Sequence, residues 1–274
     1  MPSGRSPSPP GLLAVTRRAA LRAGERLRQQ RRASMRLVAV MVASVAALQP
    51  PKPPQAILFD IDGTLFDSDP VHLRAFQKIL VEEGFNDGVE IDEAFFMETI
   101  SGRQNKLICR DIFPDWDEAR SEAFSARKEQ MFRDMSRGGL APIDGLIDFM
   151  GEIDRRGLRK AAVTNAPRLN AESMLDGIER REWFDALVIG DECVRAKPDP
   201  EPYLVAARAL GVEIAQCVVV EDSPSGASAG AAAGAFVVGM LSSQTPEALT
   251  AAGCAALVRD YRELGALLAL SPQR

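Results

Sequence analysis

The chain has 274 residues, of which 46% are hydrophobic and 26% charged, which suits one large or two modest globular domains. Its net charge of −5 is unevenly distributed: residues 1–55 carry nine Arg, one Lys and one Glu, whereas the rest carries 23 basic and 37 acidic residues. The acidic body argues against nucleic acid as a partner. The four cysteines are far apart and form no CxxC pair, so we expect reduced thiols rather than disulfides or a zinc site.

Residues 1–54 are predicted to be a presequence or a disordered basic segment. They are rich in Arg and Pro and poor in acidic residues, which is typical of an organellar transit peptide. We therefore expect the plastid stroma as the location, with the mitochondrion or the cytoplasm as alternatives. The apolar run 37–48 is 12 residues long, shorter than the ~20 that cross a membrane, so no membrane partner is expected. It would suit a signal peptide starting at Met35, but no disulfide chemistry follows.

The segment Ala56–Phe59 is a short unbroken apolar run, which predicts a strand buried on both faces of a parallel sheet. Two carboxylates, Asp60 and Asp62, follow the strand at once, and Gly63 then frees the backbone to turn. In open parallel sheets, ligands bind at the carboxyl ends of the strands. These aspartates are therefore candidates for a functional site.

Between residues 70 and 141 the apolar spacing predicts helices only. The predicted helices span 71–83, 91–100, 105–113 and 116–137. In the last of them, the residues expected to face inward are Ala123, Phe124, Ala126 and Met131, with many charged residues outward. Because this block interrupts a pattern of alternating strands and helices, we expect it to be a cap domain inserted into a core of residues 55–69 and 142–274.

From residue 142 onward, predicted helices and strands alternate. The predicted strands are 160–163, 186–189, 217–220, 235–238 and 255–258. This alternation predicts an α/β fold with a Rossmann-like, doubly wound parallel sheet. The small-residue stretch Ser225–Ala235 lacks a G-x-G-x-x-G motif and is predicted to pack closely on the sheet rather than to bind phosphate.

A distinctive polar group follows each strand that we expect to be central. These groups are Asp60, Asp62, Thr164, Asn165, Lys197, Glu221 and Asp222. Because the carboxyl ends of parallel strands meet at one edge, the groups are expected to converge. Several carboxylates at one point repel each other unless a cation intervenes, and hard oxygen ligands select Mg²⁺. The set fits a magnesium-dependent phosphoryl-transfer site.

In this order and with these separations, the same residues resemble the four motifs of the haloacid dehalogenase (HAD) superfamily, and the helical cap resembles subgroup I. The strings ILFDIDGTLFDSDPVHLRAF, GFNDGVEIDEAFF, AAVTNAP and EDSPSGASAGAAAGA further resemble plant broad-range sugar-phosphate phosphatases, over nearly all of residues 55–265. The resemblance implies Mg²⁺-dependent hydrolysis of small phosphate monoesters through an aspartyl-phosphate. It makes small phosphorylated sugars the expected partners, and we expect a monomer.

The resemblance also gives each motif residue a task. Asp60 is expected to attack phosphorus, and Asp62 to exchange a proton with the leaving hydroxyl and then with water. Thr164 and the amides near Asn165 are expected to hold the phosphoryl oxygens, and Lys197 to offset their charge. The expected Mg²⁺ ligands are Asp60, the backbone carbonyl of Asp62, and Asp222, with Glu221 in or beside that shell.

Two residues outside the motifs are further candidates for substrate binding. His72, the only histidine, either faces the site or lies on a helix surface. Arg103, in a predicted cap loop, either binds the non-reacting part of a substrate or is solvated.

Three other functions compete with the phosphatase hypothesis. A phosphosugar mutase would use the same core with a cap that closes on two phosphates in turn. A dehalogenase is disfavoured, because a halide leaving group would give Asp62 no task. A catalytically silent binding or regulatory protein would have no chemical need for the complete motif set.

Overall fold

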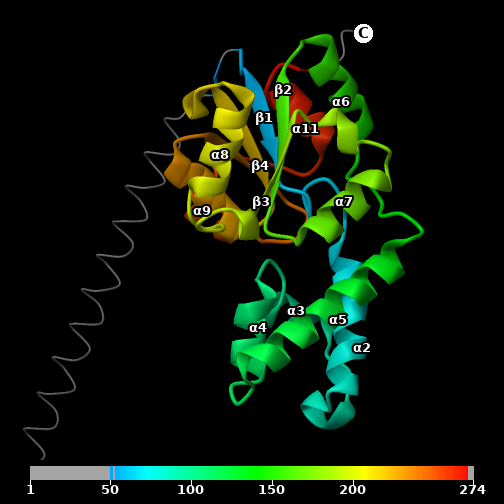
Figure 1. The fold of residues 1–274 in the computed structure, drawn as a ribbon. Helices are drawn as coiled ribbons and strands as arrows, with labels where there is room; N and C mark the ends of the chain where they lie inside the picture. The colour runs from blue at the N-terminus through cyan, green and yellow to red at the C-terminus, as the bar shows by residue number, and fades with distance from the viewer. Residues whose placement is uncertain (1–49, 52, 271–274) are drawn as a thin grey trace, which may run out of the picture. The chain divides into compact units, whose positions relative to one another are not determined.

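The computed structural model describes residues 50–51 and 53–270. Within this range one sheet of parallel strands runs in the order β3-β2-β1-β4-β5-β6 (Figure 1). Its strands are β1 (Ala56–Phe59), β2 (Arg159–Thr164), β3 (Ala186–Ile189), β4 (Cys217–Glu221), β5 (Phe236–Met240) and β6 (Ala256–Val258). The predicted transit peptide falls almost wholly on residues 1–49, outside the described range, and stays a prediction. No described helix is long and apolar enough to cross a membrane.

Strand β1 lies in the middle of the sheet because all four of its side chains are apolar and need burial on both faces. It pairs in parallel with β2 and β4, and Phe59 stands in register with Ala162 and Val220. Since the strand order reverses direction between β1 and β4, a crevice for a ligand is expected where these two strands end.

Helices cover both faces of the sheet (Figure 1). On one face lie α6 (Leu146–Arg155), α7 (Arg168–Asp176) and α11 (Tyr261–Leu267), which share a core with Phe59, Val220 and Val238. On the other lie α8 (Glu201–Leu210), α9 (Pro224–Ala233) and α10 (Pro246–Ala251), which share a core with Leu58, Val219 and Val237. The prediction of a doubly wound α/β fold is confirmed.

The segment between β1 and α6 is helical. It contains α2 (Asp69–Glu82), a 3₁₀ turn (Phe85–Gly88), α3 (Glu93–Thr99), α4 (Asn105–Ile112) and α5 (Glu118–Ser136). These helices have a core of their own, built around Phe76, Phe96 and Phe124, and we call them the cap. The two segments that join the cap to the sheet domain pair with each other: the Asp67 amide donates to the Ala141 carbonyl (3.1 Å), and the Ile143 amide to the Leu65 carbonyl (2.9 Å).

The predicted inward face of α5 is partly wrong. Phe124 is buried as expected, but Ala123 and Ala126 are exposed. The buried face continues instead through Lys128, Glu129 and Phe132. Positions 124, 128 and 132 are four residues apart and therefore lie on one face. Lys128 and Glu129 are buried because each finds charged or polar partners, which a reading of apolar spacing cannot detect.

The prediction of close packing by the small residues of α9 leads to a stability test. An added Cβ at Gly230 would lie 2.9 Å from Val237 Cγ2 and 3.0 Å from Val219 Cγ1. Because both valines are buried in the sheet, Gly230→Ala is expected to lower the free energy of unfolding by about 1–3 kcal/mol. Gly151→Ala, in α6, meets only a long arginine side chain at 3.7 Å and is expected to be neutral or to stabilise by about 0.4–1 kcal/mol. Urea unfolding measures both, and equal effects would contradict the packing argument.

Candidate active site

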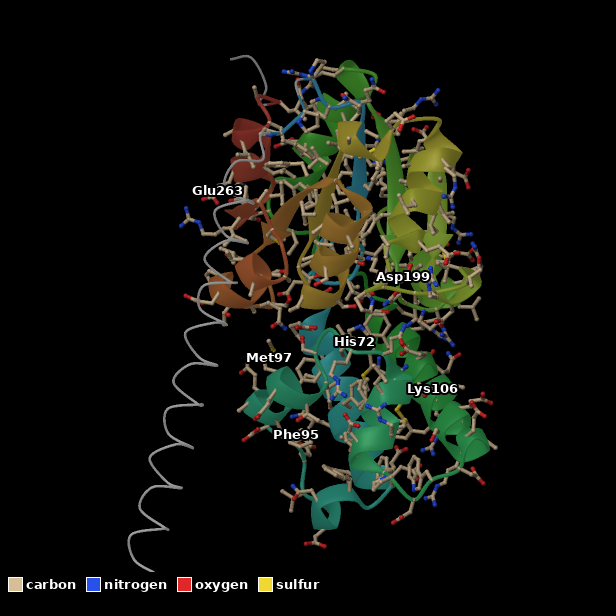
Figure 2. The ribbon with its side chains drawn as sticks, turned by 90° about the vertical axis from the view of Figure 1, so that its left-hand side faces the viewer. His72, Phe95, Met97, Lys106, Asp199 and Glu263 are labelled. Carbon is tan, nitrogen blue, oxygen red and sulfur yellow. The ribbon has the colours of Figure 1, made fainter. Side chains whose placement is uncertain are left out.

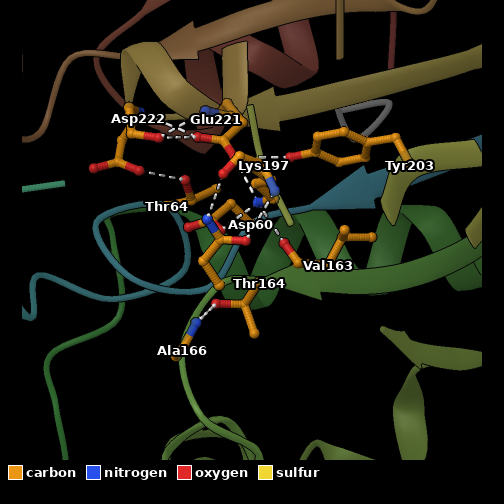
Figure 3. Close-up of polar contacts among 12 residues, drawn as sticks. Asp60, Thr64, Val163, Thr164, Ala166, Lys197, Tyr203, Glu221 and Asp222 are labelled. Atoms are coloured by element: carbon orange, nitrogen blue, oxygen red, sulfur yellow. Dashed lines mark hydrogen bonds and ion pairs between the residues drawn. The ribbon is translucent and has the colours of Figure 1, made fainter. Parts of the chain in front are cut away.

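The site lies at the carboxyl edge of the sheet, where β1, β2 and β4 end (Figure 3). Asp60 follows β1, Thr164 ends β2, and Glu221 ends β4. Lys197, from the loop before α8, reaches the same point and is 4% exposed. The structure therefore brings together groups that lie up to 162 positions apart in the sequence, from Asp60 to Asp222.

The ammonium of Lys197 is the centre of this arrangement. Its Nζ donates to Asp60 Oδ1 (2.7 Å), to Glu221 Oε1 (2.6 Å) and to the Val163 carbonyl (2.7 Å). Burial acts to lower the pKa of Lys197, but the charges of Asp60 and Glu221 outweigh it, so the pKa is raised and the lysine stays charged. A buried cation with three acceptors has no free N–H, which fixes its position.

Glu221 is the anion that holds Lys197 in place. Its Oε1 also accepts from the Tyr203 hydroxyl (2.8 Å), and its Oε2 accepts from the Ser223 amide (3.1 Å) and hydroxyl (3.0 Å). All four lone-pair sites of this fully buried carboxylate are thus occupied. Glu221 would enter a metal shell only by losing one of these donors, which favours a place beside the expected metal position.

Asp60 and Asp222 are the carboxylates left open toward a metal. With Glu221 they form the acidic group of the described residues whose ligand atoms lie within 4.8 Å of one another. Asp222 is oriented by the hydroxyls of Ser243 (2.6 Å) and Thr64 (3.2 Å). Burial raises the pKa of both aspartates well above the usual range, and neighbouring carboxylates add to the effect. A bound cation would relieve that repulsion, so the donor set fits a divalent metal.

Asp62 is in contact with His72, which is in turn in contact with Lys128, and both of these residues come from the cap. His72 Nε2 lies 3.0 Å from Asp62 Oδ1, and Lys128 Nζ lies 2.9 Å from His72 Nδ1 (Figure 2 shows His72). Because the lysine can only donate, Nδ1 accepts and Nε2–H donates to the carboxylate. Burial acts to raise the pKa of Asp62, but the hydrogen bond that His72 donates and the nearby charge of Lys128 outweigh it, so the pKa is lowered.

The helix-surface alternative for His72 is therefore wrong. Its ring is stacked on Phe132, with centroids 4.0 Å apart, and its two nitrogens are engaged by Asp62 and Lys128. The predicted substrate-binding role of His72 stays untested, since the structure shows a contact to Asp62, the predicted acid–base residue.

Thr164 and Asn165 take different positions at the end of β2. Thr164 is 1% exposed; its Oγ1 accepts from the Ala166 amide (3.0 Å), which leaves the hydroxyl hydrogen free for an oxygen in the site. The Asn165 side chain is used to clamp the backbone of Lys197 at both N–H (3.2 Å) and C=O (3.1 Å). Asn165 thus positions Lys197 with its side chain, and no hydrogen bond between described residues uses its backbone amide, which stays available to a phosphoryl oxygen.

Arg103 lies at the edge of the same cavity. Its Nη1 donates to the Thr99 carbonyl (2.6 Å), and its Nη2 pairs with Asp111. The guanidinium is thus bonded within the cap, and its predicted contact with a sugar stays a prediction.

A cavity of about 890 Å³ lies over these groups and is lined by both the sheet domain and the cap. Asp60, Asp62, Thr164 and Lys197 line it from the sheet, and Phe76, Trp116 and Lys128 are among the residues that line it from the cap. Its volume is ample for a small phosphorylated metabolite.

Three site residues escaped the sequence analysis: Lys128, Tyr203 and Ser243. Each is an isolated polar residue with no motif around it, and each meets its partner only through the fold. Lys128 carried one usable signal, since it shares a helical face with Phe124 and Phe132.

The fold and the site define a class: a doubly wound α/β enzyme with a buried carboxylate–lysine pair under a helical cap. The family model of haloacid dehalogenase-like hydrolases matches residues 54–234. The chain therefore belongs to the haloacid dehalogenase-like hydrolases.

Relatives and solved structures agree with this family. A phosphoglycolate phosphatase from Rhodospirillum rubrum is 30% identical over 77% of this chain and 90% of its own. The fructose-1-phosphate phosphatase YqaB from Escherichia coli is 30% identical over 65% of this chain and 92% of its own. The structure of CbbY from Rhodobacter sphaeroides in complex with xylulose-(1,5)bisphosphate matches with a TM-score of 0.67, at 27% identity over 78% of this chain and 99% of that one.

The four donors of Glu221 generate a test with a matched control. Tyr203→Phe removes a hydroxyl that donates to a buried carboxylate, so the free energy of unfolding is expected to fall by about 1.5–3 kcal/mol. Tyr261→Phe removes an equally buried hydroxyl that donates to the neutral Thr64 carbonyl (2.9 Å), and a loss of about 0.5–1.5 kcal/mol is expected. Urea unfolding at neutral pH compares the two variants. A smaller loss of unfolding free energy for Tyr203→Phe than for Tyr261→Phe would mean that the buried Glu221 carboxylate does not depend on the Tyr203 hydroxyl for its stability.

Proposed function

We propose that this protein is a Mg²⁺-dependent phosphatase that hydrolyses small phosphate monoesters, with sugar phosphates as the substrate class. The observation that carries the proposal is the buried Asp60–Lys197–Glu221 arrangement at the floor of a cavity of metabolite size. The proposal is supported by relatives whose names are those of phosphatases acting on phosphoglycolate and fructose 1-phosphate.

The first half of the reaction forms an acyl phosphate on Asp60. Lys197 occupies Oδ1, so Oδ2 is the oxygen open for attack on phosphorus. The P–O bond to the leaving alkoxide breaks as the Oδ2–P bond forms, and Asp62 gives the alkoxide its proton. Lys197 and the Thr164 hydroxyl lie where they can stabilise the negative charge on the transferring phosphoryl group.

The second half releases phosphate. Asp62, now a carboxylate, takes a proton from water as the water oxygen attacks phosphorus, and the bond to Asp60 breaks. The lowered pKa of Asp62 keeps its carboxylate ionised, as this step requires. For the acid step Asp62 must take up a proton before the leaving group departs, and the contacts from His72 and Lys128, which favour the ionised carboxylate, then favour release of that proton to the alkoxide.

Mg²⁺ would be held by Asp60, Asp222 and the backbone carbonyl of Asp62. The ion would screen the approach of an anionic substrate to these carboxylates and help neutralise the transferring phosphoryl group. Thr64 and Ser243 would keep Asp222 oriented for that role.

A phosphosugar mutase remains the second candidate, because it would use the same core. The named relatives above favour hydrolysis. Appearance of inorganic phosphate in step with loss of the sugar phosphate, without an isomeric sugar phosphate, separates hydrolysis from isomerisation.

Asp60→Asn tests the covalent step. An amide is a far poorer nucleophile than a carboxylate, so phosphate release from a panel of sugar phosphates is expected to fall by a factor on the order of 10⁴ or more. Asp67→Asn, seven positions on and exposed, is the control and is expected to keep full activity. Circular dichroism checks that both variants are folded. Turnover by folded Asp60→Asn at the native rate would falsify the covalent mechanism.

Metal removal tests the cofactor. Excess EDTA is expected to abolish phosphate release, and Mg²⁺ in excess of the chelator is expected to restore it. Because Asp222 has no substitute among the open carboxylates, Asp222→Asn is expected to raise the Mg²⁺ concentration for half-maximal activity by roughly tenfold or more. A Mg²⁺ titration of activity measures this shift, and full activity in EDTA would exclude the metal proposal.

A further inference from the structure

Asn170 joins the sheet domain to the cap through both ends of its side-chain amide. It lies on α7 and is 1% exposed. Its Nδ2 donates to Glu129 Oε2 (2.5 Å), and its Oδ1 accepts from Arg133 Nη1 (2.6 Å). Both partners are on α5, four residues apart, so they present an acceptor and a donor side by side on one helical face.

The chemistry of these two bonds permits only one orientation of the amide. A carboxylate can only accept and a guanidinium can only donate, so rotating the amide by half a turn would break both bonds. Both bonds involve a charged partner and are therefore among the stronger hydrogen bonds. Two domains could touch without a contact that requires one amide orientation. The fixed order of donor and acceptor therefore indicates a defined docking position of the cap.

The cap partner Glu129 also leads back to the reaction centre. Its Oε1 accepts from Lys128 Nζ (2.9 Å) and from Asn105 Nδ2 (2.5 Å). Lys128 in turn bonds to His72, which bonds to Asp62. One continuous chain of side chains thus runs from α7, through the cap, to the acid–base carboxylate.

The two chain segments that join the cap to the sheet domain do not by themselves fix where the cap lies, so the Asn170 contact can determine its docked position. The chain enters and leaves the cap through two segments only, next to Phe66 and Pro142, which pair with each other. Such a paired connection can serve as a hinge, and any movement of the cap about it would carry Lys128 and His72 away from Asp62.

We propose that Asn170 is a positioning residue: it is the catch on the sheet domain that Glu129 and Arg133 engage when the cap closes. Through Glu129 it fixes Lys128 and His72 against Asp62. With both ends of its amide occupied, Asn170 acts through these residues rather than by contact with the substrate. The kinetic part of the test rests on the proposed function, whereas docking of the cap can be measured without any substrate.

The donor and the acceptor of the hydrogen bond between Asn170 and Glu129 can be exchanged by two substitutions. Asn170→Asp sets a carboxylate against Glu129, so the catch is expected to open. Adding Glu129→Gln supplies an amide that donates to the new carboxylate, while its oxygen still accepts from Lys128 and Asn105. The double variant keeps the native net charge and reverses one hydrogen bond. A rescue by the second substitution therefore reports the contact itself.

Hydrogen exchange by mass spectrometry, without substrate, is the first readout. Asn170→Asp is expected to raise the exchange of α5 and of the two hinge segments, and the double variant is expected to return it toward native values. For sugar phosphates kcat is expected to fall roughly 10- to 100-fold with KM within about threefold, and to recover in the double variant. If exchange follows this pattern while no variant, nor the native protein, releases phosphate, the proposed function fails and the catch stands.

Arg133→Met tests the second arm of the catch in a residue whose loss is not expected to unfold the protein, because its side chain is only partly buried. It is expected to lower kcat and raise exchange in the same direction as Asn170→Asp. The control is Arg137→Met, at the C-cap of α5, whose exposed side chain pairs with Asp134 of that helix. Native exchange in Arg133→Met, or a double variant no better than Asn170→Asp, would overturn the proposal. So would a rise in KM at unchanged kcat, which would indicate direct substrate contact.

Discussion

The site depends on one buried cation, the ammonium of Lys197, between Asp60 and Glu221. Three carboxylates at the ends of two strands would destabilise the fold if they were left uncompensated, because burial and mutual repulsion both oppose their charge. Lys197 offsets part of that repulsion without occupying Asp222, and a bound metal would offset more. Its attachment to Val163 and the clamp by Asn165 tie its position to β2, so three strands are brought to a common point.

Asp62, the proposed acid–base group, is organised differently from Asp60, the proposed nucleophile. Lys197, which holds Asp60, comes from the sheet domain, whereas Asp62 is bonded to His72 of α2, which is bonded in turn to Lys128 of α5. Formation of a phosphoryl-accepting site is therefore independent of the cap, but the proton transfers are not. This division ties proton transfer by Asp62 to the cap that covers the cavity, and a covered cavity limits the access of water.

The sequence predicted the sheet and its polar edge well, because both depend on residues that are adjacent in the sequence. Short apolar runs followed by Asp60, Thr164 or Glu221 identify buried strands and their carboxyl ends without any knowledge of the fold. The residues it missed depend on contacts between distant parts of the chain. Tyr203 and Glu221 lie 18 positions apart, and Lys128 meets His72 across 56. Helical periodicity also did not identify Lys128 and Glu129 of α5 as buried, because apolar spacing carries no information about a lysine and a glutamate that pair with each other.

The paired hinge has a consequence for how such a chain can vary. Because Leu65 and Asp67 hydrogen-bond to Ile143 and Ala141, the insertion leaves and re-enters the sheet domain at nearly one point. For the sheet domain, the insertion is thus a loop whose two ends are held together. The entropic cost of closing a loop grows only with the logarithm of its length, by about 0.6 kcal/mol per doubling. The cap also has its own apolar core, built from contacts within the insertion. Residues could therefore be gained, lost or exchanged in the cap with little effect on the sheet, so that substrate choice and catalytic chemistry can diverge on separate parts of one chain.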